Sequence, residues 1–346
     1  MGRKVAITIL ILAMLTGTSA LAGIGTTYVR ESGTVLPPSY AGNSGYDLLI
    51  VTPSEFAIAL QPLITHKDSH GVQTILVTLD EVYNGDYFTV QGRDDAEKVK
   101  YFIKDAIEEW GIKYVMLVGG RRPGVAEEWF MPARYSHIVD DVETPENKYL
   151  SDLYFADIYD SGGNFSSWDT NNNGIFSEWH SGEKADDTAD LYPDVYVGRL
   201  PCRNEFEVKT MVDKIITYEN GTYGKPWFNR IVAVGGDTYP SNDYYEGEVT
   251  NQKVIDEMQG FEPVKLWTSD GSLKNWRDVV KTINQGCGFI NFEGHGSPTT
   301  WATHPPYDES TWIYGLQIFQ MPLLSNGDML PVCVVGGCHN SLFNIS

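Results

Sequence analysis

The chain alternates between apolar runs and amphipathic segments over most of its length. The apolar runs contain few polar residues, which is typical of strands buried on both faces of a sheet. They cover residues 46–52, 72–78, 114–118, 195–197, 231–234, 288–293 and 331–335. Helices are predicted between these runs, at residues 53–69, 94–110, 204–219, 245–259 and 273–285. This order of elements predicts an α/β fold with a parallel or mostly parallel sheet flanked by helices.

Changes in this pattern divide the chain into regions. Residues 121–192 are loop-rich and acidic, so we expect two subdomains, residues 46–190 and residues 191–346. Residues 23–45 are a polar stretch that we expect to form an N-terminal arm. The chain ends eight residues after Cys338, and we expect the C-terminal subdomain to be truncated there.

The first 22 residues have the pattern of a secretory signal peptide. Arg3 and Lys4 precede an apolar segment, residues 5–15, which is too short to span a membrane comfortably. Small residues follow at 20–22, so cleavage is expected after Ala22. The alternative is an uncleaved anchor. We therefore expect a secreted or cell-surface protein without stable membrane insertion.

The charge of the chain argues against two classes of partner. It carries 25 Lys and Arg against 46 Asp and Glu, a formal net charge of −21. Nucleic acid and polybasic membrane contacts require the opposite sign. An acidic surface usually serves solubility, and cation binding is the more specific alternative.

Two of the apolar runs end in residues suited to nucleophilic chemistry. Segment 288–297 delivers His295 and segment 331–340 delivers Cys338. The strand ends of an open parallel sheet meet at one edge, where ligands bind. A histidine and a cysteine at that edge can form a thiolate–imidazolium pair, which is a nucleophile at neutral pH. Each residue alone is more often structural, but the pair predicts catalysis.

Acyl transfer also requires donors for the developing oxyanion. Gly296 follows the histidine and Gly337 precedes the cysteine, and both allow close backbone approach to a substrate carbonyl. The expected donors are the backbone N–H groups of Gly296 and Cys338. His339 is a second candidate base, although adjacent residues seldom face one another.

The other cysteines are Cys202, Cys287 and Cys333, and no C-x-x-C zinc pattern occurs. Cys333 is five residues before Cys338 on the same predicted strand, so its side chain should point to the opposite face. We expect Cys333 to lie in the core.

The acidic middle region contains the first half of an EF-hand-type calcium loop. Oxygen-bearing side chains occupy positions 1, 3 and 5 from Asp169, and Gly174 occupies position 6. Position 12 is His180 instead of glutamate, so another acid must complete a structural Ca²⁺ site. The alternative is a surface Asn-Gly turn without metal. The expected ligands are Asp169, Asn171, Asn173, Ile175 and Glu178.

Three segments together resemble the gingipain family of cysteine peptidases. Residues 293–301, EGHGSPTTW, look like the histidine motif of that family, and residues 334–343, VVGGCHNSLF, resemble its cysteine segment. The histidine and the cysteine are 43 positions apart, similar to the family. Residues 193–202, PDVYVGRLPC, look like its strand-then-Gly-Arg segment.

The resemblance implies a caspase-like α/β fold of two subdomains and endopeptidase activity on protein or peptide substrates. It assigns Cys338 as the nucleophile and His295 as general base and acid. The acidic partner of the histidine falls on Asp194, where aligned members have the longer glutamate.

Two other functions remain open. An amine could resolve the acyl-enzyme instead of water, which would make the protein a sortase-like transpeptidase. A protein of this fold could also be a non-catalytic, calcium-stabilised binding module.

Overall fold

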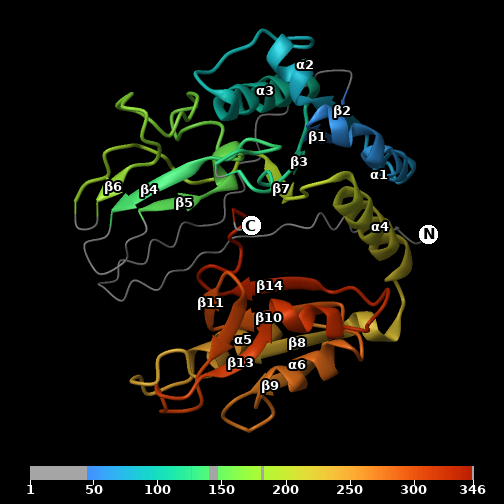
Figure 1. Ribbon diagram of the computed structural model, residues 1–346, viewed down its shortest axis with the longest axis vertical. Coiled ribbons are helices and arrows are strands. Elements are labelled where there is room, and N and C mark those ends of the chain that lie inside the picture. Colours follow the sequence, from blue (N-terminus) through green and yellow to red (C-terminus); the bar gives the residue numbers. More distant parts are fainter. Residues whose placement is uncertain (1–44, 126, 140–146, 181–182, 345–346) are drawn as a thin grey trace. The chain divides into compact units, whose positions relative to one another are not determined.

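The computed structural model describes residues 45–125, 127–139, 147–180 and 183–344 (Figure 1). The signal peptide expected at residues 1–22 and nearly all of the arm expected at 23–45 lie outside these residues. The chain forms two compact units, which are divided between Val212 and Asp213. None of the described helices combines the length and apolar character needed to cross a membrane.

The N-terminal unit contains a four-stranded, fully parallel sheet in the order β2-β1-β3-β7. The central strand β1 is completely buried, which agrees with its uninterrupted apolar run. The strands of this sheet are β1 (Leu48–Thr52), β2 (Thr74–Thr78), β3 (Tyr114–Val118) and β7 (Tyr196–Leu200). The helices are η1 (Ser54–Phe56), α1 (Ala57–Ser69), α2 (Leu79–Asn84) and α3 (Asp95–Trp110).

Helix α3 shows how the local sequence sets these boundaries. Asp94 is its N-cap, and the Asp94 carboxylate accepts a hydrogen bond from the backbone N–H of Glu97 at 2.9 Å. Gly111 ends the helix in the left-handed conformation, with φ of 73°. Its buried side, which includes Val99 and Ile103, packs into one core cluster with the sheet.

The acidic middle region is more structured than its sequence predicts. It forms a second small sheet in the order β5-β4-β6, and its fully buried Tyr154 and Trp168 join the core cluster of the N-terminal parallel sheet. These strands are too short to produce a recognisable periodicity. The elements are β4 (Tyr135–Val139), β5 (Lys148–Leu150), η2 (Asp152–Phe155) and β6 (Trp179–His180).

The C-terminal unit has its own four-stranded parallel sheet, in the order β14-β10-β8-β9 (Figure 1). Helix α6 packs on the face that carries Val232 and Ile290. Helix α5 covers the other face, where Asn251 donates a hydrogen bond to the carbonyl of Val234. The parallel elements are β8 (Arg230–Gly235), α5 (Glu246–Glu257), β9 (Glu262–Trp267), α6 (Trp276–Ile283), β10 (Phe289–Glu293) and β14 (Val332–Gly336).

A second, antiparallel sheet follows β10 in the same unit, in the order β11-β12-β13. It begins at His295 itself and was not expected from the sequence. The remaining elements of this unit are η3 (Pro226–Asn229), β11 (His295–Ser297), β12 (Thr300–Thr303), β13 (Ile313–Gln317) and η4 (Ile318–Leu323).

The structure confirms the α/β class with parallel sheets, but the units divide at a different place from the expected 190/191. Strand β7 pairs with β3 and therefore belongs to the N-terminal unit. The division lies within α4 (Glu205–Gly221). The loop-rich composition before residue 192 marked a change in local pattern, whereas strand pairing decides which unit a segment joins.

Candidate active site

The predicted catalytic pair lies at one edge of the C-terminal parallel sheet. Strands β10 and β14 are neighbours, and their register places Glu293 opposite Gly336. His295 and Cys338 each follow this last pair by two residues. Parallel strands deliver their C-terminal ends to the same edge, so the register brings the two segments together as expected.

The backbones of these segments touch at the two glycines. A Cβ added to Gly296 would lie 2.7 Å from the carbonyl carbon of Gly337, and one added to Gly337 would lie 3.1 Å from the Cα of Gly296. Only glycine permits both approaches. The glycines were expected to admit a substrate carbonyl, and the structure shows that they also allow the histidine and cysteine segments to meet.

The imidazole of His295 has a hydrogen-bond partner that the sequence did not reveal. Its Nε2 lies 2.7 Å from the backbone carbonyl oxygen of Thr238. A carbonyl only accepts, so Nε2 carries a proton and Nδ1 is the basic atom of the neutral ring. Within the described residues, neither His295 Nδ1 nor the Cys338 thiol makes a hydrogen bond, and both are available for proton exchange.

Aromatic rings surround the His295 imidazole. The ring centroids of Tyr239, His304 and Trp312 lie 5.7, 5.6 and 5.3 Å from that of His295, all in edge-to-face geometry. These contacts restrict rotation of the imidazole about its side-chain bonds. Tyr239 and Trp312 remain half exposed, so the rings also form part of the surface beside the site.

Neighbouring contacts hold the Thr238 carbonyl in place. Asp237 exchanges two backbone hydrogen bonds with His304, and the Tyr239 N–H donates to the Glu246 carboxylate at 3.1 Å. Both neighbours of Thr238 are therefore fixed. A rigid acceptor keeps the histidine in one tautomer and one orientation.

The four cysteines differ in the solvent exposure of their side chains. Cys338 and Cys333 are exposed, whereas Cys202 and Cys287 are buried, and all four are free thiols. Desolvation raises the pKa of Cys202 and of Cys287 to about 11 and that of Cys333 to about 12, although the Cys333 side chain is solvent-accessible, and all three thiols stay protonated at neutral pH. Cys338 lies at the sheet edge beside the histidine segment, which is the position expected of the catalytic nucleophile.

The exposure of Cys333 contradicts the expectation that this residue lies in the core. Cys333 pairs with the buried Ile290 of β10. Its side chain points to the opposite face of the sheet from Val332 and Val334, because side chains alternate along a strand. It remains exposed because β14 is the edge strand of the sheet.

A carboxyl group lies behind the site. Glu293 accepts a hydrogen bond from the side-chain amide of Asn291 at 3.2 Å, and its Oε2 is 2.5 Å from the position of a Cβ on Gly336. Burial raises the pKa of the Glu293 carboxyl above its usual value, and the Asn291 bond offsets part of this rise. The site therefore has a partly buried acid directly beneath the cysteine segment.

Asp194, the expected acidic partner of His295, lies in the N-terminal unit. Its Oδ2 accepts hydrogen bonds from the backbone N–H groups of Ile158 and Tyr159, at 2.7 and 2.8 Å. These contacts make it a backbone cap before β7. Its role beside the histidine remains a prediction.

The first three expected calcium ligands lie in one turn. Oxygens of Asp169 and Asn171 both accept the N–H of Asn173, each at 2.9 Å, so their side chains converge. The second Asp169 oxygen pairs with Arg93 at 2.5 Å, which already supplies a positive charge there. The side-chain oxygen of Asn173 accepts the Ile175 N–H at 2.7 Å.

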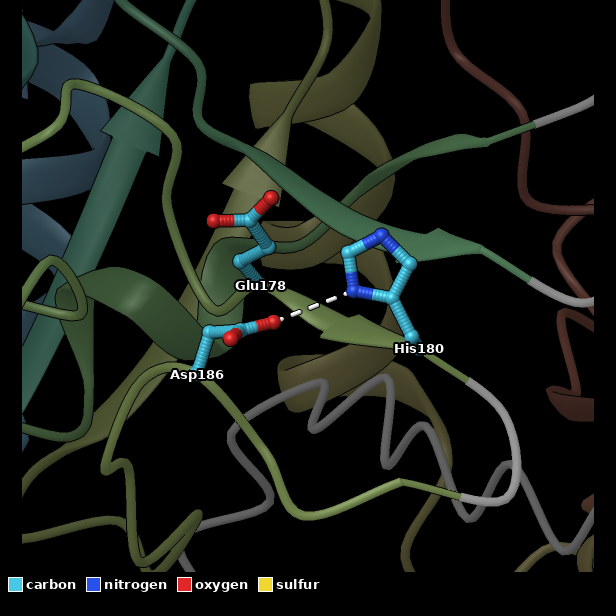
Figure 2. A group of neighbouring side chains, drawn as sticks. All are labelled: Glu178, His180 and Asp186. Carbon is cyan, nitrogen blue, oxygen red and sulfur yellow. Dashed lines mark hydrogen bonds and ion pairs between the residues drawn. The ribbon is translucent and has the colours of Figure 1, made fainter.

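Glu178 contacts the same turn through Asn173. Its carboxylate accepts from the Asn173 side-chain nitrogen at 2.8 Å. Figure 2 shows Glu178 with His180 and Asp186, and ligand atoms of the three lie within 4.8 Å of one another. His180 and Asp186 form an ion pair at 3.0 Å, which raises the pKa of His180. Glu178 thus connects the turn at Asn173 with the His180–Asp186 pair, and Ca²⁺ binding by this turn stays a prediction.

Two residues of the site escaped the sequence reasoning. Thr238 acts through its backbone, and the only signal was the Gly235-Gly236-Asp237 turn at the end of a predicted strand. Asn340 donates hydrogen bonds from its side chain to the carbonyls of Ser297 and Thr300. Its signal was its position two residues after the cysteine.

Comparison with known proteins identifies the family to which the chain belongs. The model of peptidase family C25 matches residues 42–346. Gingipain R1 of Porphyromonas gingivalis is 23% identical over 295 residues, which cover 82% of this chain and 24% of that protein. Gingipain R2 of the same organism is 22% identical over 264 residues, 74% of this chain and 28% of that protein. The chain thus spans about a quarter of these relatives.

Solved structures show the same fold. The crystal structure of the Arg specific cysteine proteinase gingipain R (RgpB) superimposes with a TM-score of 0.60 at 20% identity, covering 88% of this chain and 56% of that one. The complex of the Porphyromonas gingivalis RgpB pro- and mature domains gives a TM-score of 0.55 at 19% identity, over 82% and 54%. Since the family model extends over both the parallel sheets and the histidine and cysteine strand ends, the chain belongs to peptidase family C25, the gingipain family of cysteine peptidases.

Proposed function

We propose that this protein is a secreted cysteine endopeptidase that cleaves protein or peptide substrates through a Cys338 thioester. The observation that carries the proposal is the β10–β14 register, which ends in contact between Gly296 and Gly337 and so places the His295 and Cys338 segments together. Export rests on the signal-peptide pattern of residues 1–22. The net charge of −21 supports a substrate other than nucleic acid.

The chemistry begins with proton transfer from the Cys338 thiol to His295 Nδ1. The thiolate attacks the scissile carbonyl carbon, and the electron pair of the C=O bond moves to oxygen. When the tetrahedral intermediate collapses, the C–N bond breaks and the His295 imidazolium protonates the leaving amine. Water then attacks the thioester and gives a proton to His295. The C–S bond breaks, the acid is released, and the His295 imidazolium returns its proton to the Cys338 thiolate.

The Thr238 carbonyl assists each proton transfer. It accepts the Nε2–H of His295 at 2.7 Å and thereby directs Nδ1 to act as the base. The same contact stabilises the imidazolium, because the Nε2–H of the charged ring is a stronger hydrogen-bond donor. The backbone N–H groups of Gly296 and Cys338 are the proposed oxyanion donors, and each such donor typically contributes about 3 kcal/mol.

We also propose that Ca²⁺ stabilises the turn at residues 169–174. The proposed ligands are Asp169, Asn171, Asn173, Ile175 and Glu178. The Asp169 and Asn171 oxygens converge on the Asn173 N–H, and the Glu178 carboxylate accepts from the Asn173 side-chain nitrogen at 2.8 Å. The ion would fix an acidic loop whose charges otherwise repel. It has no part in the proposed chemistry.

Labelling by a peptidyl acyloxymethyl ketone tests the function. The wild type, Cys338→Ala and His295→Ala are compared, with Cys333→Ala as a matched control because Cys333 is the other exposed thiol. We expect labelling of the wild type and the control, and none of the two active-site variants. No labelling of the wild type, with calcium and reductant present, would favour a non-catalytic binding module.

A further inference from the structure

The side chain of Asn340 connects the cysteine segment to the hairpin that begins at the histidine. Its Nδ2 donates to the carbonyl oxygens of Ser297 at 2.8 Å and Thr300 at 3.0 Å. Ser297 and Thr300 form the last pair of the β11–β12 hairpin. Because both partners are carbonyls, the amide nitrogen must face the hairpin. Asn340 therefore holds the hairpin turn through two bonds from one group.

The oxygen of the same amide lies between the two glycines of the site. A Cβ on Gly296 or on Gly337 would collide with Asn340 Oδ1. This oxygen is buried, and it has no hydrogen-bond partner within the described residues. The Asn340 amide thus fills the space at the point where the histidine and cysteine segments meet.

The regular strand pairing stops before this point. The Gly294 N–H donates to the Gly336 carbonyl at 2.9 Å, directly before His295 and Gly337. Beyond it, the two bonds of Asn340 continue the link between the segments. The proposed oxyanion donors come from both segments, so their separation depends on this link.

We propose that Asn340 is a positioning residue, which sets the distance between the Gly296 N–H and the Cys338 N–H so that both can bind one oxyanion. The inference rests on the proposed function. Asn340 acts through Gly296 and the hairpin, and its side-chain amide does not contact the reacting atoms. Electrostatic stabilisation of an oxyanion depends on donors held within fractions of an ångström.

The test uses Asn340→Asp, which keeps the shape of the side chain but replaces both N–H donors with an oxygen. Asn326→Ala is the matched control, since Asn326 also donates from its side chain to a backbone carbonyl, that of Met329 at 2.8 Å, away from the site. Three quantities are measured: kcat and KM for a fluorogenic peptide, alkylation of Cys338 by iodoacetamide, and hydrogen exchange of residues 295–300.

For Asn340→Asp we expect kcat to fall about 100-fold with little change in KM, the loss typical of one oxyanion donor. Alkylation by iodoacetamide should change by less than about threefold, because attack on this reagent needs a thiolate but forms no oxyanion. Exchange of residues 295–300 should accelerate. The Asn326→Ala variant should match the wild type in all three.

Two results would overturn the inference. The first is unchanged exchange of residues 295–300 in Asn340→Asp, whatever its activity. The second is a parallel loss of kcat and iodoacetamide alkylation, since this would mean damage to the dyad or the fold. If the wild type neither turns over nor alkylates, the proposed function fails and the catalytic role of Asn340 fails with it. The exchange measurement still decides whether Asn340 holds the hairpin.

Discussion

Replacing Gly296 with alanine tests whether the contact between the two glycines sets the geometry of the site. The added Cβ would lie 2.7 Å from the Gly337 carbonyl carbon, whereas ordinary contact begins at 3.4 Å. It would also collide with Asn340, whose amide nitrogen is held by two carbonyls. Neither obstacle is the free end of a flexible side chain, so ordinary contact returns only if the histidine and cysteine segments separate by about 0.7 Å, the difference between 3.4 and 2.7 Å.

That separation predicts a large effect on the rate and a moderate effect on stability. A misplacement approaching 1 Å at a reacting centre typically costs about 100-fold in rate. Overpacking of a tight contact costs about 1–3 kcal/mol in the free energy of unfolding. Since domains have about 5–15 kcal/mol of stability, Gly296→Ala should remain folded and its kcat should fall about 100-fold.

The assay combines turnover of a fluorogenic peptide with urea unfolding of the same samples. Gly221→Ala is the matched control, because no atom lies within 4 Å of its added Cβ. Gly221 is the last residue of α4, so alanine there should leave kcat unchanged and keep or slightly raise the stability. Near wild-type kcat in Gly296→Ala would refute the reasoning, because the segments would then tolerate separation without loss of catalysis.

Three further predictions follow from the charged groups. Asp194→Asn should lower the free energy of unfolding by about 1 kcal/mol, since the Asp194 carboxylate accepts hydrogen bonds from two backbone N–H groups. A fall in kcat at unchanged stability would instead identify Asp194 as the acidic partner of His295. Glu293→Gln should gain stability relative to the wild type as pH rises from 4.5. Burial raises the folded-state pKa of Glu293, so the wild type loses stability as pH rises through that pKa, and equal pH dependence in a calorimetric comparison would contradict this. EGTA should lower the melting temperature of the wild type but not of Asp169→Ala, and equal shifts would exclude Asp169 as a ligand.

The sequence predicted the parts of this fold that depend on local pattern. The strands around residues 48–52 and 289–293 and the helix from Asp95 are found within a few residues of their expected positions. Each has a strong local cause, such as a continuous apolar run or the Asp94 cap. The approach of the histidine and cysteine segments was also predictable, because parallel pairing brings the ends of neighbouring strands together.

Features set by tertiary contacts were not predictable in this way. The β11–β13 sheet consists of strands of three to five residues, none of which is a continuous apolar run. The exposure of Cys333 depends on β14 being an edge strand, and strand order is not visible in a single sequence. The partner of His295 is a backbone carbonyl, which any residue type at position 238 would supply.

The Thr238 carbonyl changes what the histidine requires from the rest of the molecule. A catalytic imidazole needs one acceptor at the nitrogen that does not exchange a proton with the thiol. In this structure the C-terminal unit supplies that acceptor itself, at 2.7 Å from His295 Nε2.

A carboxylate could take the same role only by displacing or sharing this contact. A neutral carbonyl stabilises the imidazolium less than a charged carboxylate does, because it adds hydrogen bonding without a full opposite charge. If Thr238 is the functional partner, Asp194→Asn should leave the rate of iodoacetamide alkylation of Cys338 at neutral pH unchanged, because no carboxylate then contributes to the thiolate–imidazolium pair. Slower alkylation of Cys338 in Asp194→Asn, at unchanged stability, would show that a carboxylate completes the site.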